Sequence, residues 1–271
     1  MRSESEPIRT RARIRPPGRV GHESVPGRQV CLIFLALCCA GVGQNLQALD
    51  ADSARFNELA HRVQSAPADA LAGDALRSLC RQRKIVRRCI DFLDSIAEAH
   101  PTVDAIVFNA ALAYVDELPN HSLLVQGRLS LHSIEHVSSV LVREPDNWIA
   151  LYIRGLNNLY WPIWYRRSDR AIADLIRCTQ LSRDLPPARR QPYMALSYLA
   201  LGDTYARLDR LDEAQVVWKE GLSMYPSKEL RDRLGISRSQ LHETIENIRS
   251  RDVPIDTSLQ NFTAGFAGGG S

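Results

Sequence analysis

The chain has 271 residues, enough for one or two domains with a sizeable core, and its 45% hydrophobic and 24% charged residues are ordinary for a soluble globular protein. The first 43 residues hold seven Arg and three Glu, so 34 − 7 and 31 − 3 leave 27 basic and 28 acidic side chains in the remainder. A body without excess positive charge argues against a nucleic-acid-binding protein.

The basic head leads into a short apolar run, Val30–Ala40 (VCLIFLALCCA), which is followed by the small residues Gly41-Val42-Gly43. A membrane span needs about 20 apolar residues, and this run is shorter. The pattern predicts a secretory signal peptide over residues 1–43, with a head long enough to suggest a start codon placed too far upstream. The alternatives are a buried helix, a short anchor, or a lipid-modified Cys38 or Cys39, although neither cysteine follows a small residue.

The basic residues comprise 31 Arg and only three Lys, a bias typical of GC-rich bacterial genomes. Together with the signal peptide, this bias predicts a periplasmic or secreted protein of the bacterial envelope, with a lipoprotein as the alternative. Contact with the membrane is then expected only through the signal sequence or a lipid anchor.

Beyond the leader, prolines recur just before helical patterns of apolar residues, at intervals of 34, 44, 47 and 34 residues. Internal repetition of this length indicates stacked helical hairpins. The repeats are expected to begin near Ala70, Asp104, Trp148 and Ala195. The predicted segments are a leading helix in 44–69, repeats over 70–226, capping helices over 227–256 and a disordered tail over 257–271.

The last hairpin, Ala195–Pro226, carries the clearest pattern. Its large and small residues follow a helical period on both sides of a short polar break: Tyr198, Leu201, Gly202, Tyr205, Ala214, Trp218, Gly221 and Pro226. This stretch resembles a tetratricopeptide repeat (TPR), with Tyr198 where Trp is usual and Gly221 where Ala is usual. The resemblance implies an all-α, helix-turn-helix repeat solenoid, a right-handed superhelix of about four degenerate repeats with capping helices.

The resemblance further implies a concave groove, lined by the first helix of each repeat, that binds a partner protein or peptide. The groove-lining residues are then Phe108, Leu112, Tyr152, Leu156, Leu199 and Asp203. Family members that bind an acidic carboxyl terminus have Lys and Asn at such positions. This chain has mainly apolar residues there, so it lacks the side chains that would bind a terminal carboxylate. The apolar groove is expected either to bind a hydrophobic helix or strand or to be filled by the chain's own terminal helices.

An aromatic insertion interrupts the third repeat with four rings in six residues: Tyr160, Trp161, Trp164 and Tyr165. Aromatic side chains dominate the energetics of interfaces, so one interpretation is a partner-docking patch. A cap over the hydrophobic core, or contact with a membrane surface, is the alternative.

Three cysteines follow the leader. Cys80 and Cys89 lie about one helical turn on either side of the first predicted bend, so a disulfide is expected in an oxidising compartment, with two core thiols as the alternative. Cys178 occupies a small-residue position of its repeat, which indicates a buried thiol.

One motif has the composition of a metal site: His132-Ser133-Ile134-Glu135-His136. Two His residues four apart share a helix face, and the order resembles that of inverted zincins, in which the Glu acts as a base. His121 is a candidate third ligand. A metal-binding protein or zinc hydrolase using His132, Glu135 and His136 is therefore the alternative hypothesis.

No nucleophile motif or phosphate-binding loop accompanies this pattern. The sequence therefore predicts an exported adaptor or scaffold that binds a protein or peptide and no nucleic acid, and not an enzyme. No cofactor or metal is expected.

Overall fold

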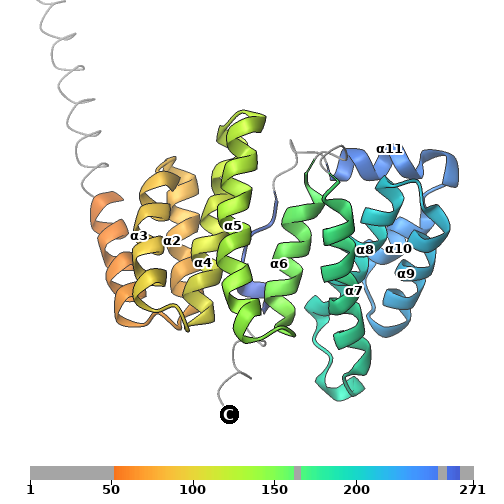
Figure 1. The fold of residues 1–271 in the computed structure, drawn as a ribbon, viewed down its shortest axis with the longest axis horizontal. Helices are drawn as coiled ribbons and strands as arrows, with labels where there is room; N and C mark the ends of the chain where they lie inside the picture. The colour runs from red at the N-terminus through yellow and green to blue at the C-terminus, as the bar shows by residue number, and fades with distance from the viewer. Residues whose placement is uncertain (1–51, 162–165, 250–254, 263–271) are drawn as a thin grey trace, which may run out of the picture. The chain divides into compact units, whose positions relative to one another are not determined.

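The computed structural model describes residues 52–161, 166–249 and 255–262, which are helical and contain no strand (Figure 1). The all-α helical-repeat solenoid predicted from the sequence is thereby confirmed. The predicted signal peptide over 1–43 and two members of the aromatic insertion, Trp164 and Tyr165, lie outside the described residues.

Helical residues 52–65 are followed by four pairs of neighbouring helices and two further helices. The pairs are α2 (Ala70–Arg83) with α3 (Val86–Ala99), α4 (Asp104–Glu117) with α5 (Leu123–Arg143), α6 (Trp148–Leu159) with α7 (Ser168–Asp184), and α8 (Ala195–Arg207) with α9 (Leu211–Met224). α10 (Lys228–Gly235) and α11 (Arg238–Ile248) come next. The first helices of the pairs begin at the four residues near which the sequence predicts the repeats to start: Ala70, Asp104, Trp148 and Ala195.

Prolines and capping side chains separate the helices. Pro101 and Pro145 lie in the turns that join successive pairs, and Pro192 opens the short 3-10 helix η4 (Pro192–Met194) ahead of α8. Proline has no N–H to donate and therefore tends to end or start a helix. The side chains of Asp69 and Asn147 accept hydrogen bonds from the first turns of α2 and α6, which fixes where those helices begin.

Small residues allow the last pair to pack closely. A Cβ added at Gly202 on α8 would lie 2.2 Å from the Trp218 indole nitrogen of α9. A Cβ at Gly221 would lie 2.5 Å from the Cβ atom of Tyr198, and the side chains of Trp218 and Tyr198 are fully buried. The alternation of large and small residues in the sequence is therefore the contact surface between α8 and α9.

The residues inserted into the middle repeats extend the turns and the second helices. α5 has 21 residues and α7 has 17, against 14 for α4. The short 3-10 helices η1 (Leu118–Asn120) and η3 (Pro187–Arg189) lie in the connections before α5 and before η4. At the start of α5, Leu123 and Leu124 are exposed.

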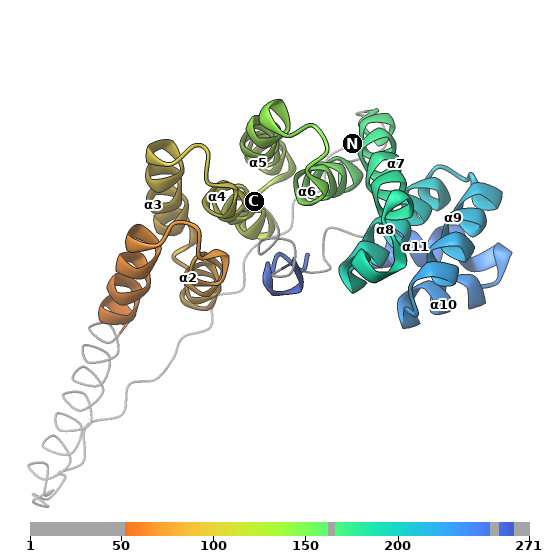
Figure 2. The same cartoon turned by 90° about the horizontal axis from the view of Figure 1, so that it is seen from below.

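Residues 255–262, here called the C-terminal segment, differ from the expected disordered tail. Figure 2 shows them in dark blue beside α4 and α6, and they end in the 3-10 helix η5 (Gln260–Phe262). Thr257, Leu259 and Phe262 are buried. The segment is ordered because its hydroxyl and apolar side chains find partners on the repeats, whereas its polar composition alone is typical of a tail. Residues 263–271 lie outside the described part.

None of the helices in the described ranges combines the length and hydropathy that crossing a bilayer requires.

Candidate functional site

The first helices of the four pairs, α2, α4, α6 and α8, carry the predicted groove residues on what we call the first-helix face. Phe108, Leu112 and Tyr152 are buried there, whereas Leu156 and Leu199 are half-buried. The C-terminal segment contacts this face, so part of the predicted groove is occupied by the chain itself. The alternative that the chain fills its own groove is thus realised in part, by this short, largely non-helical segment and, at Asp203 on α8, by the residues of the terminal helices.

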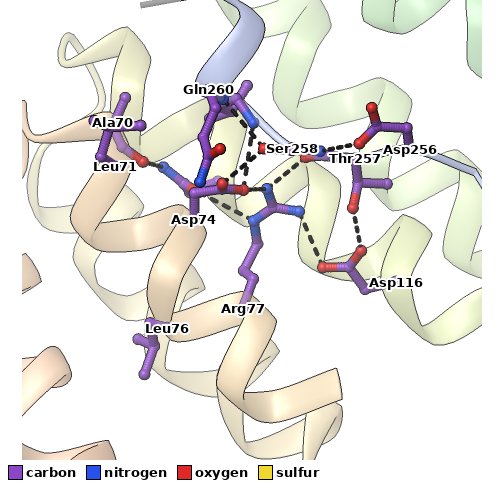
Figure 3. Close-up of polar contacts among 12 residues, drawn as sticks. Ala70, Leu71, Asp74, Leu76, Arg77, Asp116, Asp256, Thr257, Ser258 and Gln260 are labelled. Carbon is purple, nitrogen blue, oxygen red and sulfur yellow. Dashed lines mark hydrogen bonds and ion pairs between the residues drawn. The ribbon is translucent and has the colours of Figure 1, made fainter. Parts of the chain in front are cut away.

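A buried arginine on α2 organises the polar end of the site. The Arg77 side chain is fully buried, and it donates four hydrogen bonds (Figure 3). Its Nε donates to Asn109 Oδ1 at 3.0 Å, and Nη1 donates to Asp116 Oδ2 at 2.9 Å. Its Nη2 donates to Asp74 Oδ1 and to the carbonyl oxygen of Thr257, each at 2.6 Å. Two carboxylates thus neutralise the buried guanidinium, which would otherwise carry a large desolvation cost.

Asn109 is held by main-chain carbonyl groups in the first turns of α2 and α4, and not by the C-terminal segment. Its Nδ2 donates to the carbonyl oxygens of Ala70 at 3.1 Å and Ala105 at 3.0 Å. A Cβ at Gly73 would lie 2.4 Å from that same nitrogen, so glycine is required for α2 and α4 to approach here. The repeats therefore hold the Asn109–Arg77 pair in place by themselves.

The C-terminal segment completes the network through its main chain and two hydroxyls (Figure 3). The Ser258 hydroxyl donates to Asp74 Oδ2 at 2.9 Å, and the Leu259 N–H donates to Asp74 Oδ1 at 3.3 Å. The Thr257 hydroxyl donates to Asp116 and accepts from Arg81 Nη1 at 3.0 Å. Residues separated by about 180 positions in the sequence are therefore joined in one buried hydrogen-bond network.

The apolar end of the site is an aromatic cluster around Phe262. The Phe262 ring centroid lies 6.3 Å from that of Trp148, 5.9 Å from that of Tyr152 and 5.3 Å from that of Tyr193. Trp148 and Tyr152 stack on each other at 5.2 Å, and the Trp148 indole N–H donates to Ser182 Oγ at 3.0 Å. Burial raises the pKa of the Tyr152 hydroxyl well above its ordinary value, as expected for a phenol removed from water.

The prediction that Asp203 lines an open groove is wrong, because the residue is buried beneath the terminal helices. Its side chain is fully buried, and its two oxygens accept from Arg233 Nε at 2.9 Å and from Arg249 Nε at 2.8 Å. Arg233 belongs to α10, and Arg249 follows α11. A carboxylate on a first helix is useful here because it pairs with both guanidiniums, so Asp203 holds the terminal helices against α8 instead of facing a partner.

The described half of the aromatic insertion packs against its own chain. The Trp161 indole N–H donates to Ser130 Oγ at 2.8 Å, and the guanidinium carbon of Arg167 lies 4.2 Å from the ring centroid. The Tyr160 hydroxyl accepts from Arg249 Nη1 at 3.2 Å. These contacts favour a structural cap at Tyr160 and Trp161. Docking by Trp164 and Tyr165 stays a prediction.

The histidine motif does not gather ligands around one point. His132 Nδ1 lies 3.2 Å from Glu135 Oε2, whereas His136 Nε2 lies 3.1 Å from Asp94 Oδ1 on α3. Both imidazoles lie against the Tyr114 ring, with centroid distances of 5.3 and 5.8 Å. Within the part of the chain that the structure describes, no three His, Cys, Asp or Glu side chains are placed to hold a metal ion. His132 and His136 therefore pair with different carboxylates and do not converge as the ligands of one zinc ion.

The cysteines take the positions expected from their spacing. Cys80 and Cys89 form a disulfide with an S–S distance of 2.03 Å, which joins α2 to α3. Cys178 is a free, buried thiol, and burial raises its pKa well above the ordinary value. The disulfide therefore braces the hairpin that carries Arg77.

Sequence reasoning missed the polar end of the site, namely Asp74, Arg77 and Asp116. A signal was present, because Asp74, Arg77 and Arg81 follow one another at helical spacings of three and four. Charged residues at such spacings usually form a solvent-exposed helix face. Here the C-terminal segment, distant in the sequence, covers that face.

Comparison with known proteins supports the fold. A crystal structure of a thermophilic TPR protein from Thermus thermophilus is similar to this chain, with a TM-score of 0.50 and 19% sequence identity. The match covers 71% of this chain and 93% of the other. Neither a protein-family model nor a curated protein sequence matches the chain. At this identity the likeness concerns the fold alone.

Proposed function

We propose that this protein is a non-enzymatic adaptor whose first-helix face binds an extended segment of a partner protein. The observation that carries the proposal is the C-terminal segment itself, which is bound across α2, α4 and α6. Its main-chain carbonyl at Thr257 and its N–H at Leu259 are both used, and peptides bound in an extended form use main-chain groups in the same way.

Two further features support a binding role for this face. The polar groups that meet the segment are pre-positioned by contacts among the repeats, so little ordering is required when a peptide binds. The aromatic cluster of Trp148, Tyr152 and Tyr193 supplies side chains of the type that dominates binding energy.

We also propose that the protein works in the bacterial envelope, in the periplasm or as a secreted or lipid-anchored protein. The leader composition supports export, and the Cys80–Cys89 disulfide agrees with an oxidising compartment. A fusion of residues 1–48 to a reporter enzyme that is active only after export tests this point. A fusion that is made but shows no reporter activity would contradict it.

Site-directed photo-crosslinking tests the binding role. A photoreactive residue at Leu156 or Leu199, both half-buried on the first-helix face, is expected to capture one defined protein in living cells. The matched control is Val216, which is 63% exposed on the second helix α9. Equal capture from Val216, or none from either leucine, would refute the proposal.

A further inference from the structure

The C-terminal segment shows which peptide chemistry the first-helix face recognises, and this inference rests on the binding role proposed above. Two of the contacts, at the Thr257 carbonyl and the Leu259 N–H, would be available to any peptide. Two others require hydroxyl side chains, because the Thr257 and Ser258 hydroxyls donate to Asp116 and Asp74. The polar end of the site therefore selects a pair of adjacent Ser or Thr residues.

The apolar contacts select the ligand residues that come after the hydroxyl pair. Leu259 is fully buried directly after the hydroxyl pair, and Phe262, three positions later, inserts among Trp148, Tyr152 and Tyr193. A short 3-10 turn gives this spacing. An aliphatic residue and an aromatic residue three positions apart thus meet separate parts of the face.

The charges of the site agree with a ligand that is uncharged from the hydroxyl pair onward, and Asp256, just before the pair, is exposed. Arg77 and Arg81 balance Asp74 and Asp116, and the two arginines are hydrogen-bonded to these carboxylates. Residues 257–262, TSLQNF, contain no charged side chain. A peptide with a charge at the hydroxyl pair would disturb a neutral, buried network, which is costly.

The tether makes the segment a competitor. It belongs to the same chain and is separated from Arg249 by only residues 250–254. A short linker gives a tethered ligand an effective concentration on the order of 1 mM, which exceeds most free partner concentrations.

We propose that the C-terminal segment is a built-in competitor for a partner peptide of the same pattern: two hydroxyl residues, a leucine, and an aromatic residue three positions after the leucine. Partner binding then requires displacement of the segment from the Arg77 network and from the aromatic cluster around Phe262. The partner is an extended protein segment and not a second copy of this chain.

The test is binding of a fluorescently labelled peptide of residues 255–262 to the full chain, measured by anisotropy. Leu259→Ala with Phe262→Ala weakens the tethered segment and leaves the first-helix face intact. We expect this double variant to bind the peptide at least about tenfold more tightly than the unmodified chain, because the tethered competitor is removed. Asn261→Ala, at an exposed position of the same segment, is the matched control and should behave as the unmodified chain. A peptide carrying alanine at both apolar positions should not bind.

Two results would overturn the proposal. If the double variant remains helical but binds the peptide no better than the unmodified chain, the segment is only a structural strap. If light scattering shows that the unmodified chain is a dimer that the double variant converts to a monomer, the segment is exchanged between copies. Photo-crosslinking from Leu156 still reports on the binding role in either case, so failure of this inference is distinguishable from failure of the proposed function.

A second measurement covers a double variant that fails to fold. A protease site inserted within residues 250–254 of the otherwise unmodified chain converts the segment into a separate ligand after cleavage. Exchange of the cleaved segment for labelled peptide supports the proposal. Retention of the cleaved segment against excess peptide would overturn it.

Discussion

Replacing Asp203 by Asn tests whether this buried carboxylate holds the terminal helices against α8. The change keeps the shape of the side chain but removes the charge that neutralises Arg233 and Arg249, both nearly buried. Hydrogen bonds to charged groups contribute about 1.5–3 kcal/mol each, and breaking a buried ion pair costs about 3–5 kcal/mol. The amide oxygen still accepts one hydrogen bond, worth about 1 kcal/mol, so we expect a loss of about 3 kcal/mol.

The assay is urea unfolding combined with hydrogen exchange. Stability in repeat proteins depends on nearest neighbours, so the loss of protection should be concentrated in α8, α10 and α11. Asp212→Asn is the matched control, because Asp212 also pairs with an arginine, Arg238, but is 82% exposed. Exposed pairs contribute about 0–1 kcal/mol. A loss below about 1 kcal/mol for Asp203→Asn, or equal losses for both variants, would refute the reasoning.

Three further changes have expected outcomes. Cys80→Ser opens a disulfide with a sequence separation of nine residues and should lower the free energy of unfolding by about 2.5–3 kcal/mol, measured with urea; an unchanged midpoint would contradict this. Gly202→Ala drives a methyl group into Trp218 and should lower the free energy of unfolding by about 1–3 kcal/mol, measured by calorimetry. Gly235→Ala should be neutral or stabilising, because an added Cβ there would meet no atom within 4 Å apart from its own stretch of helix. The raised pKa of Cys178 means that the folded thiol stays protonated after the unfolded thiol ionises near 9.0, so its contribution to stability should decline as the pH rises above that value. Iodoacetamide should then label Cys178 at pH 8.5 only in urea, and labelling of the folded protein would be inconsistent with this burial.

The helix pairs were predictable from the sequence because their packing is local. Gly202 and Trp218 are 16 positions apart, and their size classes alone indicate that α8 and α9 cross closely there. Pro101 and Pro145 mark the corners for an equally local reason, since each lacks an N–H at the start of a turn.

The polar end of the site could not be predicted in the same way. Arg77 belongs to a residue type that is almost never fully buried unless it is paired, and its partners lie on α2, on α4 and at Thr257, near the end of the chain. Asp203 was misassigned for the same reason, because its position on a first helix indicates a groove and only α10 and the residue after α11 show that the position is covered.

The separation of about 180 residues between Arg77 and Thr257 has a consequence for synthesis. At translation rates of about 5–20 residues per second, Thr257 leaves the ribosome about 9–36 s after Arg77. The early hairpins can form through contacts between neighbouring helices, in the compartment that they reach, before Thr257 arrives to supply the last acceptor of the network at Arg77. Closure of the network is therefore a late event in the life of a new chain, and until then a nascent protein presents the same surface that a ligand would meet.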